Sequence, residues 1–184
     1  MGICVSTARL LGHAESVRTP MPLTGGPASG KSATAAELAK TLPRVAVIDV
    51  DDIRHLVVAG HAAPWDGNEG VLQQRIGVEN SCDLARRFLG AGIEVVMADV
   101  LNDATAALYR RLVPSVVIVR LHLPLREARR RATLRPRHLT DRQFEDLHAM
   151  EATNTFPADH DIQVGGLSLE EQRDAVMQLW SNVR

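Results

Sequence analysis

The chain is poor in cysteine and aromatic residues and has no long apolar run, and each shortage excludes a class of protein. Two cysteines in 184 residues are too few for a disulfide framework and lack metal-ligand spacing, so a reducing cytoplasm is the simple expectation. Aromatic residues make up 3% of the chain, which leaves few side chains for stacking on nucleic acid bases. No apolar run approaches the roughly 20 residues of a membrane span.

Net charge is also small. The chain has 21 basic and 22 acidic side chains and a formal charge of −1, so no overall field draws it to nucleic acid or to a membrane surface. An apolar content of 45% and a charged content of 23% are typical of a globular protein, and the length suits one domain with a real core. We expect a floppy N-terminal extension at residues 1–20 and a single domain at residues 21–184. The sequence leaves the oligomeric state open.

A glycine-rich segment carries the strongest functional signal. It reads GGPASGKS and fits G-x-x-x-x-G-K-[ST] without a gap. Glycines let the backbone N–H groups point at phosphate oxygens, which a Cβ would obstruct. The lysine brings a positive charge to the β- and γ-phosphates, and the serine offers a hydroxyl to Mg²⁺. We therefore expect ATP and Mg²⁺ at Gly25, Gly26, Pro27, Ala28, Ser29, Gly30, Lys31, Ser32 and Ala33.

Apolar β-branched runs alternate with helical patterns along the rest of the chain. This alternation predicts an α/β fold of three layers with a mainly parallel sheet of five strands. The first strand, just before the glycine-rich segment, is expected to be short or irregular because Pro20 and Pro22 cannot donate to a sheet ladder. Further strands are predicted at 44–50, 93–98, 115–121 and 161–164, and helices at 32–42, 52–59, 71–90, 102–112, 124–135, 140–152 and 168–182.

Three carboxylates follow the strand at 44–50, in the segment DVDDIR. A carboxylate at this place can accept the proton of an attacking hydroxyl or hold Mg²⁺ through water. We assign that functional role to Asp51 and expect Asp49 or Asp52 only to cap the next helix. Arg54 lies one turn after Asp51 on the same side of the helix, where it can clamp an acceptor or a phosphate.

Together, GGPASGKS and VIDVDDIR resemble the small P-loop phosphotransferases. That group includes chloramphenicol phosphotransferase, adenylylsulfate kinase and the 5′-kinase domain of polynucleotide kinase. The resemblance implies that Asp51 is the catalytic base towards the acceptor hydroxyl and that Arg54 contacts the acceptor. It extends over residues 22–182, is specific at the phosphate loop, and implies a class of reaction but no substrate.

The strand at 93–98 ends at Asp99, in the sequence IEVVMAD. This resembles a Walker B position, at which a carboxylate orients the Mg²⁺ shell opposite Ser32. The chloramphenicol phosphotransferase pattern has two acidic residues here, whereas this chain has Ala98 and Asp99. We predict a metal-shell role for Asp99, with a cap on the turn towards Asn102 as the alternative.

A run of arginines follows the fourth predicted strand. In small kinases an arginine-rich lid closes over the phosphates and neutralises the charge that develops on the transferred group. Arg131 and Arg135 are four residues apart, share a helix face, and are our candidates for a short lid. A solvated basic face and a patch for a nucleic acid backbone are the alternatives. The run consists of Arg126, Arg129, Arg130, Arg131, Arg135 and Arg137.

Two loops are candidates for recognising the substrates. The loop HAAPWDGNE at 61–69 follows the aspartate segment, and Trp65 either forms a wall of the acceptor pocket or only pins the loop. Gly165 and Gly166, after the last strand, can let the backbone approach an adenine base.

These features favour an ATP-dependent kinase that moves the γ-phosphoryl group to a hydroxyl of a small molecule, with Lys31, Asp51, Arg54, Arg131 and Arg135 as catalytic residues. One alternative is a kinase of nucleic acid 5′ ends, favoured by DDIR and the arginines but disfavoured by the net charge. Another is a module that binds and hydrolyses nucleoside triphosphates to drive a partner.

Overall fold

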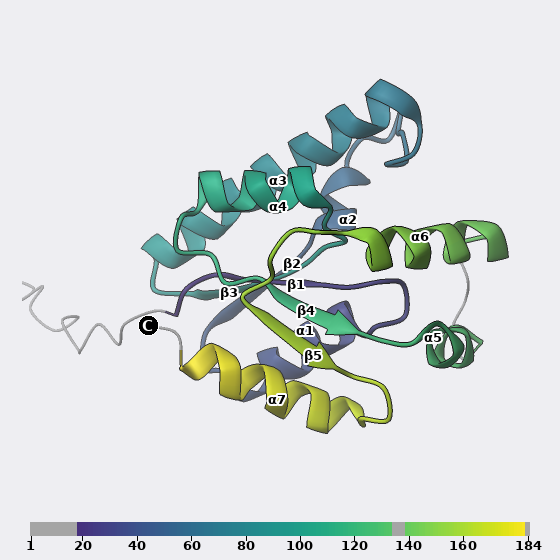
Figure 1. Ribbon diagram of the computed structural model, residues 1–184. Coiled ribbons are helices and arrows are strands. Elements are labelled where there is room, and N and C mark those ends of the chain that lie inside the picture. The colour runs from purple at the N-terminus through teal and green to yellow at the C-terminus, as the bar shows by residue number, and fades with distance from the viewer. Residues whose placement is uncertain (1–17, 134–138, 183–184) are drawn as a thin grey trace, which may run out of the picture.

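The computed structural model describes residues 18–133 and 139–182 (Figure 1). Five strands form one sheet in the order β2-β3-β1-β4-β5, and every neighbouring pair is parallel. The predicted parallel five-stranded sheet is therefore confirmed. The strands are β1 (Met21–Thr24), β2 (Val45–Asp49), β3 (Glu94–Ala98), β4 (Val119–His122) and β5 (His160–Gln163).

Helices cover both faces of the sheet, as the alternating pattern predicts (Figure 1). One face carries α1 (Lys31–Thr41) and α7 (Leu169–Ser181), and the other carries α2 (Val50–Arg54), α3 (Gly67–Gly90) and α4 (Asp103–Leu112). Two more helices, α5 (Leu125–Ala132) and α6 (Asp141–Thr153), lie beyond the carboxyl end of β4. No helix in the described ranges is both long and apolar enough to cross a membrane.

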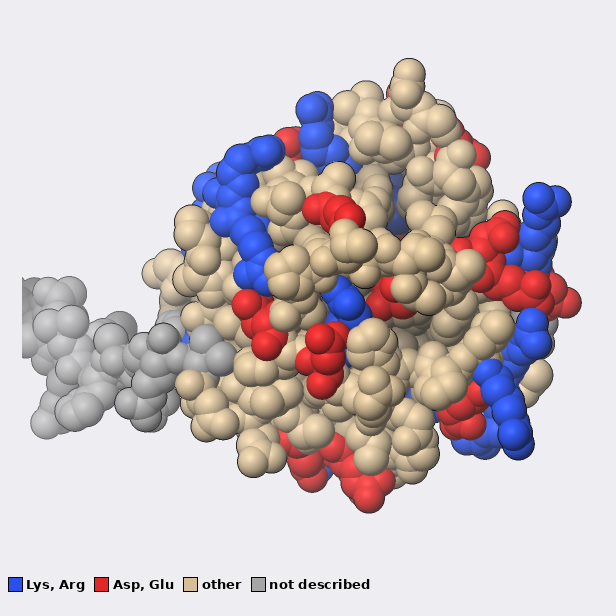
Figure 2. Space-filling view, viewed as in Figure 1, with Lys and Arg blue, Asp and Glu red and all other residues tan. Residues whose placement is uncertain are grey.

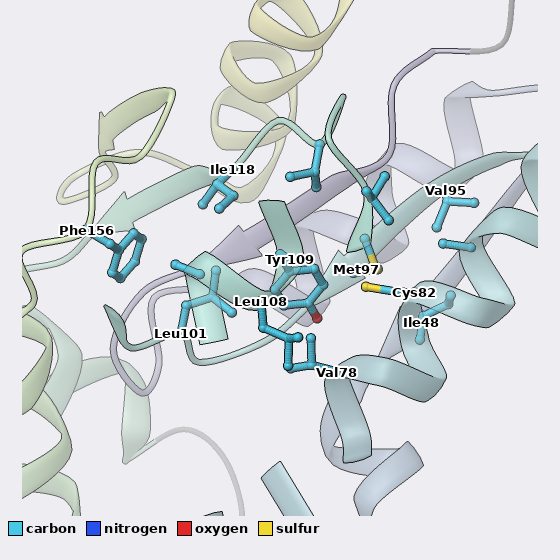
Figure 3. Close-up of a cluster of buried hydrophobic side chains, with 14 residues drawn as sticks. Ile48, Val78, Cys82, Val95, Met97, Leu101, Leu108, Tyr109, Ile118 and Phe156 are labelled. Carbon is cyan, nitrogen blue, oxygen red and sulfur yellow. The ribbon is translucent and has the colours of Figure 1, made fainter. Parts of the chain in front are cut away.

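The core consists of one apolar cluster on each face of the sheet. Val95 and Met97 of β3 pack towards α3 and α4, whereas Val96 faces α1 and α7, because successive side chains of a strand alternate. Figure 3 shows the first cluster, in which Cys82 and Tyr109 are fully buried among the aliphatic side chains. Burial on both faces explains why the strands read as continuous apolar runs rather than as alternating patterns.

Pro22 lies in β1, the central strand, and delays the start of β4. The carbonyl of Pro20 accepts from the N–H of Val117, and the pairing of β1 with β4 then resumes at Leu23, opposite Val119. Proline has no N–H, so Pro22 cannot donate to the carbonyl of Val117, as another residue at this place in the ladder would. For this reason the strand predicted at 115–121 begins only at Val119, four residues later than expected, and it ends at His122.

Two predicted helices also differ from the structure at their ends. The helix expected at 52–59 spans only Val50–Arg54. It begins two residues earlier than expected because the side chain of Asp49 caps it by accepting from the N–H of Asp51. The helix expected from residue 71 begins at Gly67. Capping boxes open α6 at Thr140 and α7 at Ser168, which confirms both predicted starts.

The end of the predicted extension already contacts the domain. The indole N–H of Trp180 donates to the carbonyl of Thr19 at 2.6 Å, and Arg18 forms an ion pair with Glu94. Residues 18–20 therefore lead directly into β1.

Candidate functional site

The segment Gly25–Ser32 connects β1 to α1 and has the backbone geometry of a compact cradle. Gly25 has a φ of 140° and Gly30 a φ of 97°, both in the region that favours glycine. A Cβ on Gly25 would lie 2.4 Å from the carbonyl oxygen of Leu121 in β4, so the loop and the sheet touch there. Ala28 also has a positive φ, of 61°, which is a strained conformation for a residue with a side chain.

Two helices that follow much later in the sequence brace the cradle. From α7, the buried side chain of Gln172 donates to the carbonyl of Ser29 at 3.0 Å and to the hydroxyl of Thr34 at 2.7 Å. From α6, Nε2 of His148 lies 3.0 Å from the carbonyl oxygen of Pro27. These contacts hold the strained backbone from both sides, so its shape does not depend on a ligand.

Lys31 begins α1 and folds back over the cradle. Its ammonium group donates to the carbonyls of Gly25 at 2.8 Å and of Gly26 at 3.2 Å. Burial lowers the pKa of Lys31, and the nearest carboxylate charges oppose that shift, with Asp51 the strongest of them and Glu151 next. A single cation therefore lies between the loop carbonyls and a group of acids.

Ser32 donates its hydroxyl to Oδ2 of Asp49 at 2.8 Å. The other carboxylate oxygen, Oδ1, accepts from the backbone N–H of Asp51 at 3.1 Å and caps α2. Asp49 thus does more than cap the helix, because it also places an acid beside the serine that the motif assigns to Mg²⁺. Sequence reasoning missed this pairing; the signal was the two-residue spacing of Asp49 and Asp51 at the end of a strand.

Asp51 lies at the carboxyl edge of the sheet and is more than half exposed. Arg54 donates to its Oδ1 at 2.7 Å, and the arginine side chain itself is 10% exposed. The stem of Arg54 passes over Gly77 of α3, where a Cβ would lie 2.7 Å from its Cγ. The arginine is therefore held by packing, and it fixes the direction of the Asp51 carboxylate.

Asp99 follows β3, as predicted, but its carboxylate is buried and already hydrogen-bonded. Oδ1 accepts from the N–H of Val100 at 2.8 Å, and Oδ2 accepts from the hydroxyl of Tyr109 at 3.0 Å. Burial raises the pKa of Asp99 to about 6, although the bond from Tyr109 lowers it. The bond from Val100 lies at the start of the turn towards Asn102, the turn that Asp99 was expected to cap in its alternative role. Asn102 itself caps α4 with its side chain.

The cradle fits a nucleoside triphosphate with Mg²⁺. Its backbone is too close to the sheet for a Cβ at Gly25, its one ammonium group lies over the loop, and its serine hydroxyl faces a carboxylate. Within residues 18–133 and 139–182, no group of three or more His, Cys, Asp or Glu side chains is arranged to hold a metal ion.

The predicted lid arginines do not all point at the cradle. Arg131 donates to the carbonyl of Val164 at 2.8 Å and to that of Leu167 at 3.3 Å, so it holds the turn after β5. Arg135 lies outside the described residues. Figure 2 shows basic side chains interleaved with acidic ones at the end of the molecule where α5 and α6 lie. Arg129 pairs with Glu145 there, and Arg130 with Glu127.

A cavity of about 250 Å³ lies between the cradle and the turn after β5. Ala28, Gly30 and Ala33 line it on one side, and Leu167, Arg131 and Gln172 on the other. Leu167 in its lining follows Gly165 and Gly166, the pair predicted to let the backbone approach an adenine base.

The loop at 61–69 is held by Gln73 of α3. The side chain of Gln73 accepts from the N–H of Ala62 at 2.9 Å and donates to the carbonyl of Gly60 at 2.7 Å. Trp65 remains about half exposed, so it does not serve as a buried pin for the loop.

No protein-family model matches the chain, and no curated protein matches it in sequence. Solved structures do share its fold. An unliganded sugar kinase from Janibacter sp. HTCC2649 has a TM-score of 0.67 and 16% identity over 90% of this chain and 95% of its own. A gluconokinase from Sinorhizobium meliloti 1021 has a TM-score of 0.60 and 18% identity, with 91% and 97% covered.

Shikimate kinase from Acinetobacter baumannii in complex with shikimate is similar at a TM-score of 0.59 and 21% identity, covering 88% of this chain and 92% of its own. At sequence identities of 16% to 21%, these structural similarities establish the fold. The three-layer P-loop fold predicted from the glycine-rich motif and the alternating pattern is thus confirmed.

Proposed function

We propose that the protein is an ATP-dependent kinase that transfers the γ-phosphoryl group to a hydroxyl of a small molecule. The observation that carries the proposal is the hydrogen-bonded link between Asp51 and the cradle: the N–H of Asp51 donates to Oδ1 of Asp49, whose Oδ2 accepts from the hydroxyl of Ser32. An acid thus lies near the cradle at the carboxyl edge of a parallel sheet, where such folds bind ligands. The neighbours with this fold include sugar, shikimate and gluconate kinases, which favours a hydroxyl acceptor.

The cradle residues hold the nucleotide. The backbone N–H groups of the loop Gly25–Ser32, other than at Pro27, would bind the phosphates, aided by the positive end of the α1 dipole. Lys31 exchanges the carbonyls of Gly25 and Gly26 for phosphate oxygens, which are stronger acceptors because they are charged. Ser32, with Asp49 beside it and Asp99 behind, would hold Mg²⁺, which neutralises charge on the β- and γ-phosphates.

Asp51 activates the acceptor. Its carboxylate takes the proton of the attacking hydroxyl as the new O–P bond forms and the bond to the leaving ADP breaks. Arg54 is a positioning residue that keeps the carboxylate turned towards the cradle. Arg131 acts indirectly on the nucleotide side, because it fixes the turn beside the adenine cavity.

A nucleic acid acceptor is disfavoured by the charges around the site. The arginines of α5 that the structure describes include three paired with glutamates, so they form no continuous basic surface for a phosphate backbone.

A screen with γ-labelled ATP and Mg²⁺ against sugars, antibiotics, nucleosides and oligonucleotides tests the proposal. The wild-type protein should label an acceptor, and Asp51→Asn should lower kcat by roughly 10²–10⁴-fold with little change in the KM for ATP. Asp52→Asn, at the exposed neighbouring position, serves as the control and should retain the rate. Transfer that survives in Asp51→Asn would remove Asp51 from the role of base.

A further inference from the structure

The helix α6 spans the candidate site from the phosphate loop to the connection after β3. His148, in the middle of the helix, contacts Pro27, and Asn154 at the C-cap donates to the carbonyl of Leu101 at 2.9 Å. The first contact places the imidazole directly against the loop that is proposed to hold the nucleotide.

The contact with Pro27 fixes the tautomer of His148. A backbone carbonyl can only accept, so Nε2 carries the hydrogen and donates at 3.0 Å. In the neutral ring, Nδ1 is then unprotonated. A Cβ on Gly26 would lie 2.9 Å from this Nδ1, so the free nitrogen rests against the loop backbone. Phe144 supports the ring, with 4.8 Å between the two ring centroids.

Burial and the positive charges near this imidazole disfavour its protonated form. Burial lowers the pKa of His148, Lys31 from the loop and Arg129 from α5 lower it further, and the bond to Pro27 opposes them. Arg129 is itself paired with Glu145 on α6, and Glu151, one turn along α6, faces Lys31. A triphosphate in the cradle would raise the pKa of His148, because it places several negative charges beside Lys31.

We propose that His148 is a phosphate-binding residue that takes up a proton when the triphosphate enters the loop. Nε2 stays on the carbonyl of Pro27, and the proton from solvent binds to Nδ1. The imidazolium then adds a second positive charge beside the loop, in addition to that of Lys31. The inference rests on the proposed kinase function, since it needs a triphosphate in the cradle, and it assigns to α6 part of the charge neutralisation expected from lid arginines.

The direct test is a proton NMR titration of the imidazole in the wild-type protein. The His148 resonance is assigned by its loss in His148→Gln, whose amide can still donate to Pro27 but cannot titrate. The expected result is a pKa that rises when MgATP is added. An unchanged or lower pKa with MgATP bound would overturn the proposal.

Calorimetry of MgATP binding in two buffers of different ionisation enthalpy gives a second readout. At a pH where free His148 is neutral and bound His148 is charged, the wild type should take up about one proton more per nucleotide than His148→Gln. Loss of the charged donor should raise the Kd by roughly tenfold or more. His160→Gln, the same change at the start of β5, is the matched control and should behave as wild type.

The outcomes separate the two proposals. Equal proton uptake in wild type and His148→Gln, with MgATP bound to both, overturns the role of His148 and leaves the kinase function standing. Failure of the wild-type protein to bind MgATP overturns the kinase function and this inference with it.

Discussion

Replacing Gly25 with alanine tests whether the cradle needs a residue without a side chain. The new Cβ would lie 2.4 Å from the carbonyl oxygen of Leu121, which is fully buried in β4 and cannot move without breaking the sheet. A φ of 140° adds strain for any L residue. Backbone strain of about 1–3 kcal/mol and an overpacking cost of similar size predict a loss of about 2–6 kcal/mol in the free energy of unfolding.

Gly60→Ala is the matched control for that measurement. Gly60 also has a positive φ, of 76°, but nothing lies within 4 Å of the Cβ that alanine would add. Urea unfolding should therefore show a loss of about 1–2 kcal/mol for Gly60→Ala, from strain alone, and a larger loss for Gly25→Ala. MgATP affinity should fall only in Gly25→Ala. Equal losses of stability in the two variants, with MgATP affinity retained in both, would refute the reasoning.

Three further predictions concern the acids near the cradle. Gly77→Ala should displace Arg54 and lower the transfer rate while leaving MgATP affinity unchanged. Gly90→Ala in the same helix has open space around the new Cβ and should stabilise the protein by about 0.5–1 kcal/mol. An unchanged transfer rate in Gly77→Ala would contradict the role assigned to Arg54. The pKa of Asp99, about 6 against an ordinary 3.8, means that the folded state binds its proton more tightly than the unfolded chain does. The free energy of unfolding should therefore fall by roughly 3 kcal/mol as pH rises from about 4 to above 6, and Asp99→Asn should flatten that slope; a slope that persists in the variant would show that another group causes it. Tyr109→Phe should raise the pKa of Asp99 further, because the hydroxyl favours the charged form.

Local patterns predicted the parts of the fold that depend on neighbouring residues. The capping boxes at Thr140 and Ser168 and the apolar run of β3 each form their element from a few adjacent side chains. The start of α3 could not be predicted in this way. Gly67 is a poor helix former, and the first turn instead packs closely on the preceding loop: a Cβ on Gly70 would lie 2.0 Å from the carbonyl oxygen of Ala63.

The same distinction between local and distant contacts applies to the candidate site. The phosphate loop, Asp51 and Arg54 were predictable because the motif and the end of a strand lie within a short stretch of sequence. Gln172 and His148 were not, since they reach the loop from 143 and 121 residues away, and no local period encodes such a contact. Arg131 was predicted to lie in a lid, but a helical face alone does not reveal that its partners are carbonyls of the turn after β5.

Binding of MgATP to the wild-type protein and to Lys31→Met tests the central claim most directly. The methionine keeps the length and apolar stem of the side chain but removes the ammonium group that lies over the carbonyls of Gly25 and Gly26. Isothermal titration should show saturable binding to the wild type and a loss of roughly tenfold or more in affinity for the variant. Absence of binding to the wild-type protein, or equal affinity in the two, would contradict the assignment of this loop as the nucleotide site.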